Sequence, residues 1–559
     1  MPEQTVVSKP LLYGGISKQA THLRHPSQVD DASNVDFSPA FGAFTRAGTK
    51  LVANLGNCRV TIGSKSGSWA VGQTVSRTTG SPAFSGWIVA IDDAGTQITI
   101  QVTSGTFTAT GVTTSGGGTA TITTIWSQWA TGTDLRLQPI ARDETERYLL
   151  IQGPNGYPRI IPVGSSLGKE AVLVEGGSTL TYLQANTPTA ADYRYCTIRD
   201  TTYIVNSKKK MAGVNYSGAG FSAGQQGVIT ASTMPHTIKR TSLSPLTFTF
   251  NAETWANRSL SPSTDRGTSV NNPLPAAIGG FPYQTLITVA SEGFAVSEIG
   301  VFNSRLMLVA GGYILFSQIN DFTDFWFDTT AAAGPPAVID SDPIQFALPG
   351  AYADRATALR KTIIFGTKEN QQYEASYSGD SFTPSTATLA ATTSIRSVPG
   401  VEMPRFQTGV LVPSISNDCG TLHYYDYDDL ALSYTTRPMS AHVESLMESS
   451  ITRVVADTTT GFAGVVADND GSTIYAMRLA YIDGKQVQNA WGKWFFASDG
   501  LTRVCDVAII GGVLYVLSEL AGAYYVHGMT LGSPLSATTE NLLTGASVSA
   551  SGESMAADA

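Results

Sequence analysis

Residues Val301 to Pro349 read VFNSRLMLVAGGYILFSQINDFTDFWFDTTAAAGPPAVIDSDPIQFALP, and this stretch indicates the fold most directly. It opens with a strand-like run at 301–310, turns on Gly311-Gly312 and returns through 313–317. Glycine readily takes the positive φ that a two-residue hairpin turn requires. A further alternating run begins at Ile344. The stretch therefore predicts one module of a large antiparallel β structure.

Aromatic residues and aspartates are interleaved after this hairpin. We interpret the aromatic cluster as a packed joint between strands rather than as a platform for stacking sugars. A glycosidase needs two facing carboxylates, and a pair such as Asp324 and Asp342 could supply them. Because aspartate is also common in turns, we favour loop capping for these side chains. The residues concerned are Phe322, Phe325, Trp326 and Phe327, with Asp321, Asp324, Asp328, Asp340 and Asp342.

The composition favours mostly β structure. The chain has 559 residues, a length that by the usual domain-size prior corresponds to roughly three or four domains. It contains 55 glycines and only 14% charged residues, and glycine mixed with Thr, Val and Ile is typical of many short strands and tight turns. The net charge of −9 argues against a tight, sequence-reading nucleic-acid binder, which usually has a strong basic bias.

Changes in composition and in hydrophobic pattern along the chain divide it into segments. Period-two alternation around Ile98 and Ile100 predicts a small, self-contained β-sandwich or barrel inserted in a larger domain. Recurring hairpins later in the chain fit the radial repetition of a propeller, although no strict sequence period is present. The expected segments are an N-terminal arm with the first core strand at 1–56, the inserted module at 57–130, a β-rich platform with a long Pro/Ser-rich connection at 131–292, a hairpin-rich propeller-like region at 293–530, and a flexible tail at 531–559.

The cysteines and the chain start give no sign of export. Cys58, Cys196, Cys419 and Cys505 are far apart and form no C-x-x-C pair, so we expect free, buried thiols in a reducing compartment. The first residues lack a basic start followed by an apolar segment, and no run of about 18 apolar residues exists. We therefore expect neither a secretory signal nor a transmembrane helix.

Several short motifs suggest chemistry but lack the required residues. His22 and His25 have no further ligand nearby for a metal, and the 468–471 acidic tetrapeptide lacks the later residues of a calcium loop. The 164–170 segment has the wrong spacing for a phosphate loop. Lys208 to Lys210 could contact DNA phosphates, but a solvated loop is the favoured interpretation. We expect no catalytic residue, cofactor or metal.

Several segments, taken in order, resemble the tail nozzle proteins of short-tailed bacteriophages, also called tail tubular protein B. The resemblance begins with Gly-Gly-Ile-Ser-Lys-Gln near the N-terminus and is clearest in the Val301–Pro349 stretch. One departure is the sequence SLSPSTDRG, where many family members have a glycine-aspartate pair. The matching residues are Gly14, Gly15, Ile16, Ser17, Gln19, Arg24, Asn34, Asp200, Asn206, Trp255, Arg258, Arg305, Leu306, Gly311, Ser317, Phe325, Asp342 and Pro343.

The resemblance implies a structural virion protein with a β-propeller. It implies a homo-hexameric ring at the distal end of the tail, below an adaptor ring similar to tail tubular protein A, that helps to seat tail fibres or spikes. Such a ring retains the double-stranded DNA genome and passes it during ejection, with gating loops that we expect within 230–292. The alternatives are a virion-associated propeller glycan hydrolase and a receptor-binding fibre or adhesin module.

Overall fold

The structure is a computed structural model of the chain. Strands make up 58% of it and helices almost none, which confirms the expected mainly β fold. The chain forms two compact units: unit 1 contains 1–55 and 401–559, and unit 2 contains 56–400. The residues described are 12–20, 22–39, 42–77, 83–92, 94–154, 156–163, 170–176, 179–214, 228–229, 233–251, 293–325, 339–369, 371–428, 433–468, 471–482, 485–496 and 502–532.

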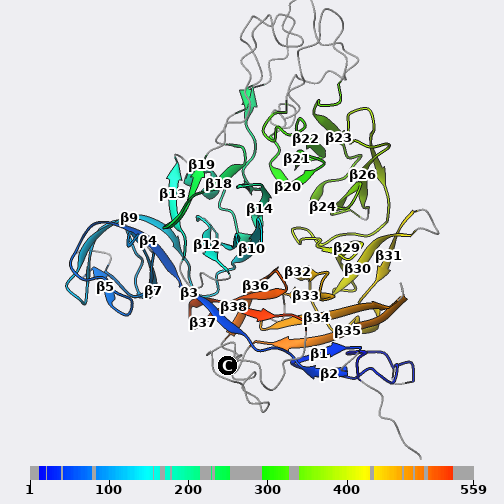
Figure 1. Cartoon of the computed structure of the whole chain (residues 1–559), viewed down its shortest axis with the longest axis horizontal. Coiled ribbons are helices and arrows are strands. Elements are labelled where there is room, and N and C mark those ends of the chain that lie inside the picture. Colours follow the sequence, from blue (N-terminus) through cyan, green and yellow to red (C-terminus); the bar gives the residue numbers. More distant parts are fainter. Residues whose placement is uncertain are drawn as a thin grey trace, which may run out of the picture. The chain divides into compact units, whose positions relative to one another are not determined.

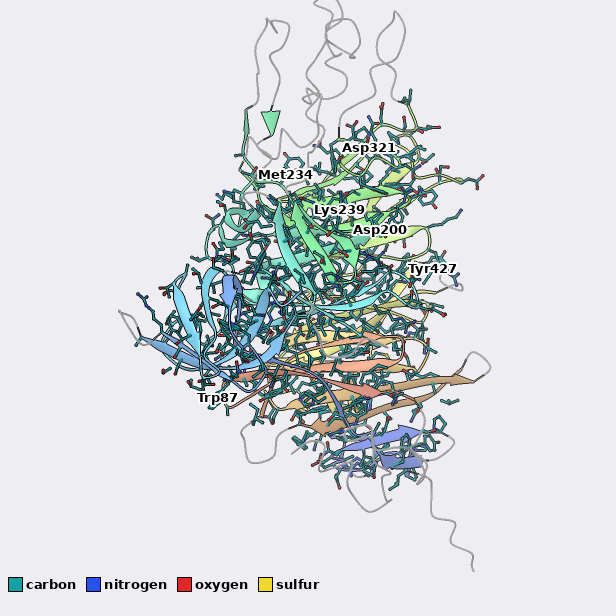
Figure 2. All side chains as sticks on the ribbon, turned by 60° about the vertical axis from the view of Figure 1, so that its left-hand side comes forward. Trp87, Asp200, Met234, Lys239, Asp321 and Tyr427 are labelled. Atoms are coloured by element: carbon teal, nitrogen blue, oxygen red, sulfur yellow. The ribbon has the colours of Figure 1, made fainter. Side chains whose placement is uncertain are left out.

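The first part of unit 2 is a closed barrel, so the expected inserted β module is confirmed (Figure 1). Alternate side chains such as Val60, Ile98 and Ile100 fill its interior and are completely buried. Trp87 lies at the barrel surface with 48% of its area exposed (Figure 2). The barrel order is β4 (Cys58–Ser66), β7 (Gln97–Ser104), β6 (Phe84–Ile91), β5 (Thr74–Arg77), β8 (Gly111–Thr114) and β9 (Thr119–Gln128).

Two sheets follow the barrel in unit 2. The three-stranded sheet is antiparallel, whereas the five-stranded sheet includes one parallel pair, β13 with β19. The first contains β10 (Arg136–Ala141), β11 (Arg147–Gln152) and β12 (Arg159–Pro162). The second contains, in order, β13 (Val172–Gly176), β19 (Leu246–Asn251), β18 (His236–Leu243), β15 (Thr201–Asn206) and β14 (Tyr193–Ile198). Smaller elements are α1 (Thr179–Gln184), a 3₁₀ turn at Ala190–Asp192, and the pair β16 (Gly213–Val214) with β17 (Val228–Ile229).

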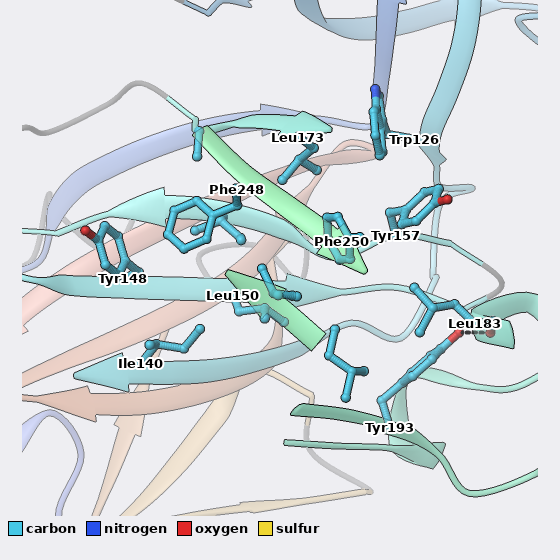
Figure 3. Close-up of a cluster of buried hydrophobic side chains, with 14 of the residues drawn as sticks. Trp126, Ile140, Tyr148, Leu150, Tyr157, Leu173, Leu183, Tyr193, Phe248 and Phe250 are labelled. Atoms are coloured by element: carbon cyan, nitrogen blue, oxygen red, sulfur yellow. Dashed lines mark hydrogen bonds between the residues drawn. The ribbon is translucent and has the colours of Figure 1, made fainter. Parts of the chain in front are cut away.

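An aromatic core joins these two sheets to the barrel (Figure 3). Trp126, at the end of the last barrel strand, packs against Tyr157 with ring centroids 4.7 Å apart. Phe250 of β19 completes the cluster at 5.1 Å from Tyr157. The Tyr193 hydroxyl donates to the Leu183 carbonyl at 2.6 Å, so this buried polar group is paired. The barrel has a core of its own, and the contacts between these large rings attach it to the two sheets of unit 2.

The Val301–Pro349 stretch lies in the next sheet, and its expected first strand needs correction. The run 301–310 is broken by a turn at Asn303-Ser304, where both residues have positive φ of 46° and 60°. Asparagine tolerates this conformation better than most residues, a signal that the apolar neighbours obscured. The turn at Gly311 is confirmed, with a φ of 59°. The sheet contains β20 (Val296–Phe302), β21 (Arg305–Ala310), β22 (Tyr313–Phe316) and β23 (Ile344–Ala347).

The last sheet of unit 2 and the three larger sheets of unit 1 are four-stranded and antiparallel. In unit 1, β3 comes from the start of the chain and pairs beside β38, so the sheet nearest the C-terminus is completed by an N-terminal strand. The sheet of unit 2 contains β24 (Ala353–Ala358), β25 (Thr362–Thr367), β26 (Tyr373–Tyr377) and β27 (Ala387–Ala391). The first two sheets of unit 1 contain β28 (Arg405–Phe406), β29 (Gly409–Ser416), β30 (Cys419–Asp428) and β31 (Ser433–Pro438), and then β32 (Ile451–Asp457), β33 (Phe462–Ala467), β34 (Thr473–Ile482) and β35 (Lys485–Phe495). The third contains β36 (Thr502–Ile510), β37 (Val513–Leu520), β38 (Ala523–Thr530) and β3 (Lys50–Gly56).

Within each unit these sheets are arranged like propeller blades, which confirms the expected propeller-like core. Consecutive strands pair through short turns, and neighbouring blades pack through their first strands, as β20 does with β24 and β32 with β36. The hairpin β1 (Val35–Ser38) and β2 (Gly42–Thr45) packs against β34 and β35. The division of the chain into five segments stays a prediction.

The cysteine prediction is confirmed only in part. None of the four thiols forms a disulfide, but only Cys58 and Cys196 are buried, whereas Cys419 and Cys505 are partly exposed. Burial raises the pKa of Cys58 and of Cys196 to about 12. These two thiols are therefore protonated and unreactive at neutral pH, as expected of cysteines that serve as small apolar side chains.

Candidate functional site

The N-terminal motif lies along the edge strand of one blade in unit 1. The Ile16 amide donates to the Trp491 carbonyl of β35 at 2.8 Å, and Ile16 is completely buried. The Ser17 amide donates to the Val29 carbonyl at 2.9 Å, which folds the arm back on itself. The motif thus covers backbone groups of β35 that an uncovered edge strand would leave available for pairing with other chains.

Both glycines of the motif are required by close packing. A side chain at Gly15, whose φ is +71°, would place its Cβ 2.4 Å from the Trp491 amide nitrogen. At Gly14 a Cβ would lie 2.7 Å from Gln28 Cγ. The clash at Gly15 is with the backbone of Trp491, which cannot move aside as a flexible side chain could.

The other matching residues of the arm hold its backbone. The Asn34 side-chain oxygen accepts from the Phe495 amide at 2.8 Å and from Arg46 Nε at 3.1 Å. Arg24 donates to the Gln19 carbonyl at 3.1 Å and forms an ion pair with Asp30. Arg46 was not singled out from the sequence, although it is only 2% exposed and stacks on Phe496 with its guanidinium carbon 4.6 Å from the ring centre.

Substitution of Gly15 by alanine is expected to release the N-terminal arm from β35. The loss combines an unfavourable φ with a backbone clash, and we expect a cost of about 3 kcal/mol. Gly512→Ala is the matched control, because Gly512 has a φ of +76° and no atom lies within 4 Å of the position that a Cβ would take there. Thermal unfolding and limited proteolysis of the arm measure the difference. Equal effects of the two substitutions would contradict the packing role of Gly15.

The second group of matching residues surrounds the β21–β22 hairpin in unit 2. Arg305 is completely buried and makes short hydrogen bonds to the carbonyl oxygens of Ser317 at 2.7 Å, Asp342 at 2.6 Å and Asp340 at 2.6 Å, with a longer one to that of Ser341 at 3.4 Å. The Ser317 hydroxyl accepts from the Leu306 amide at 2.9 Å. Burial lowers the pKa of Arg305 to about 10, which still leaves the guanidinium charged at neutral pH. The arginine therefore fastens the loop before β23 to the hairpin.

The aromatic and acidic residues of this stretch are also part of its packing. Phe325 is completely buried in a cluster with Leu306 and Leu308, and Phe322 packs against that cluster. The Asp342 carboxylate caps the Ile339 amide at 3.0 Å. Asp324 and Asp342 are 1% and 0% exposed, so neither is placed to meet a polysaccharide. Trp326, Phe327 and Asp328 lie outside the described residues.

The remaining matching residues of unit 2 hold turns and close packing. The Asp200 carbonyl, at the β14–β15 turn, accepts from Arg142 at 2.6 Å. The Asn206 side chain donates to the carbonyls of Tyr182 and Ala185, each at 3.0 Å, and so caps the end of α1. Gly311 lies against the Phe294 ring, and Pro343 is buried. Trp255 and Arg258 lie outside the described residues.

Unit 2 contains a buried ionic cluster that was not apparent from the sequence. Glu170 lies between Arg59 of the barrel and Arg159 of β12, and the Arg59 Nη1 to Glu170 Oε2 distance is 2.7 Å. Burial by itself would raise the pKa of Glu170, but Arg159 and Arg59 lower it overall. Arg159 also stacks on the Trp129 ring at 4.8 Å. Glu170, the last residue of the 164–170 segment, thus joins the barrel to the blades of unit 2.

One cleft of about 270 Å³ lies in unit 1 beside the N-terminal motif. Its walls include His25, His442 and Asn489, together with Tyr13 and Gln28. Burial lowers the pKa of His442, so its ring is neutral at physiological pH. The lining offers hydrogen-bonding groups but no carboxylate that could serve as a strong general base or hold a cation.

The other candidate residues show structural surroundings. Lys208 follows β15, is half exposed, and has its Nζ 3.8 Å from an Asp192 oxygen, which favours the solvated-loop interpretation. In the described part of the chain, no three His, Cys, Asp or Glu side chains gather in a way that could hold a metal ion. Among the described helices, none combines the length and apolar character needed to traverse a bilayer. Most of the expected gate segment 230–292 lies outside the described residues.

Comparisons with known proteins give a clear result for sequence and a weak one for structure. The model of the bacteriophage nozzle protein family matches residues 106–230 and 220–542. No curated protein sequence matches the chain. Among solved structures, Hsv2 of Kluyveromyces lactis aligns with a TM-score of 0.30 and 10% identity, covering 59% of this chain and 70% of its own. YCF48 bound to D1 peptide aligns with a TM-score of 0.35 and 10% identity, covering 73% and 94% respectively.

These structural similarities are too low to carry an argument, but the family match spans well over half of the chain. The hairpin and blade residues that suggested the resemblance lie mostly within the matched range. The chain therefore belongs to the bacteriophage nozzle protein family and is a structural component of a phage tail.

Proposed function

We propose that the protein forms the distal nozzle of a short tail as a homo-hexameric ring below an adaptor ring similar to tail tubular protein A. The ring retains double-stranded DNA, passes it during ejection into a bacterial host, and helps to seat tail fibres or spikes. The observation that carries this proposal is the family match over residues 106–230 and 220–542. The subunit is made in the host cytoplasm before it joins the virion.

Electrostatics support a conduit rather than a DNA-binding surface. DNA carries about one negative charge per 1.7 Å of its axis, so a basic wall would hold it and slow its transit. The chain has 35 Lys and Arg residues against 44 Asp and Glu residues. An acidic or neutral wall lets the genome slide, and loops that close the channel would shift between two states when the receptor is engaged.

The burial of Asp324 and Asp342 argues against these two residues as the catalytic pair of a glycan hydrolase. A glycosidase pair must reach the scissile bond with both carboxyl groups. Asp324 and Asp342 are buried, and Asp342 caps a backbone amide. These carboxylates therefore support a structural role in the tail.

Assembly with the adaptor ring tests the proposal. The full-length protein, mixed with the purified adaptor ring, is expected to form a complex that electron microscopy resolves as a six-fold ring with an open axis. Light scattering checks the subunit number independently. A trimeric rod would favour a receptor-binding fibre, and failure to bind the adaptor ring at saturating concentration would contradict a nozzle. Turnover of host polysaccharide by the purified protein would restore the hydrolase.

A further inference from the structure

The first strands of four blades share a bulge followed by a charged residue, a feature that is not apparent from the sequence. Each strand has a β-bulge near its start, after the first residue in three strands and after the third residue, Val504, in β36. In each strand the next paired residue is charged. A bulge adds one residue and changes the direction of the side chain that follows it. All four charged side chains are at most 7% exposed. They are Glu298 of β20, Arg355 of β24, Arg453 of β32 and Asp506 of β36.

In unit 2 these residues pair across the boundary between neighbouring blades. Arg355 Nη1 lies 3.1 Å from Glu298 Oε2. Arg194, on the edge strand β14, has its Nε 3.9 Å from the same carboxylate oxygen. The Ser297 hydroxyl, within the bulge, donates to the Ala353 carbonyl of the next blade at 3.0 Å. The order of charges along the chain is positive, negative, positive.

In unit 1 the same positions pair with the opposite polarity. Arg453 Nε lies 3.2 Å from Asp506 Oδ1 on the following blade. On the other side, Arg453 Nη1 lies 2.7 Å from Glu402 Oε1, just before β28. The order of charges along the chain is negative, positive, negative. Both polarities are therefore compatible with the same strand geometry.

We propose that these alternating charges, all buried except the partly exposed Glu402, specify which blades become neighbours within each unit. The charges at Glu298, Arg355, Glu402, Arg453 and Asp506 recur about every 50 residues, a period typical of propeller blades. Blades of similar shape and apolar surface can pack in the wrong order or with a second copy of the chain during folding. A wrong neighbour places like charges together or leaves a buried charge without a partner, and both arrangements are strongly unfavourable.

Charge inversion within unit 1 tests the pairing. Arg453→Glu and Asp506→Arg alone are each expected to lower Tm by about 5–10 °C. The double variant restores more than half of this loss, and adding Glu402→Arg restores more, because the full alternation returns. The control inverts Asp426 and Arg437, a pair 3.3 Å apart whose arginine is 52% exposed, and leaves Tm nearly unchanged. Losses that simply add in the double variant would overturn the pairing.

Replacing both charged residues with neutral ones tests whether the pair selects the neighbouring blade, independently of its contribution to stability. Arg453→Met with Asp506→Asn removes both charges and keeps an acceptor for the Val507 amide, which Asp506 caps at 2.8 Å. Removal of both members of a buried pair is usually well tolerated, so Tm stays near that of the wild type. On refolding from denaturant, the yield of the species that co-elutes with the native protein is expected to fall at least about twofold, with misassembled species increasing with concentration. A yield equal to that of the wild type would overturn the proposal.

Discussion

Replacement of Glu170 by glutamine is expected to destabilise unit 2 by about 3–5 kcal/mol, because it leaves two buried guanidinium groups without a countercharge. Glu170 contacts both Arg59 and Arg159, whose side chains are 1% and 0% exposed. The effect should concentrate where the barrel meets the blades. Hydrogen exchange of β4 and β12, together with the thermal unfolding midpoint, measures it.

The pH dependence gives a second readout for Glu170. Its pKa in the folded protein is lowered from the ordinary value of 4.5 by the two arginines. The unfolded chain therefore binds the proton first as pH falls, so the wild type loses the stability contributed by this carboxylate below about pH 4.5. The difference between wild type and Glu170→Gln should shrink on acidification. Glu144→Gln, at an exposed position of the same unit, is the control and should behave as the wild type at every pH.

Replacement of Arg305 by methionine is expected to cost about 3–4 kcal/mol, since three carbonyl oxygens lose a charged donor and two of them, those of Ser317 and Asp342, are buried. Methionine retains much of the apolar stem, so the loss reports the hydrogen bonds to Ser317, Asp340 and Asp342. Limited proteolysis should show faster cleavage around 339–342, and thermal unfolding should show a lower midpoint.

Arg360→Met serves as the comparison for Arg305, because Arg360 is an exposed arginine in the same unit. It should leave both readouts unchanged. A variant at Arg305 that unfolds and is cleaved like the wild type would show that the loop before β23 is held by its apolar contacts alone.

The strands and hairpin turns were predictable because they depend on residues that are close together in the sequence. Alternation around Ile98 and Ile100 indicated barrel strands, and Gly311 indicated a hairpin turn. The turn at Asn303-Ser304 was missed because apolar residues on both sides suggested one continuous strand. The order of several short motifs was enough to identify the nozzle family, which the family model confirms.

The roles of the charged residues required the tertiary structure. Glu170 and Arg59 are far apart in sequence, and nothing local distinguishes them from solvated surface charges. The bulges that turn Glu298 and Arg453 toward the neighbouring blade depend on strand pairing, which the side-chain pattern of one strand does not specify. The β class, the hairpins and the family could all be inferred from the residues alone. Which charges are buried together depends on the folded arrangement, because a buried charge is stable only beside a partner that folding brings from elsewhere in the chain.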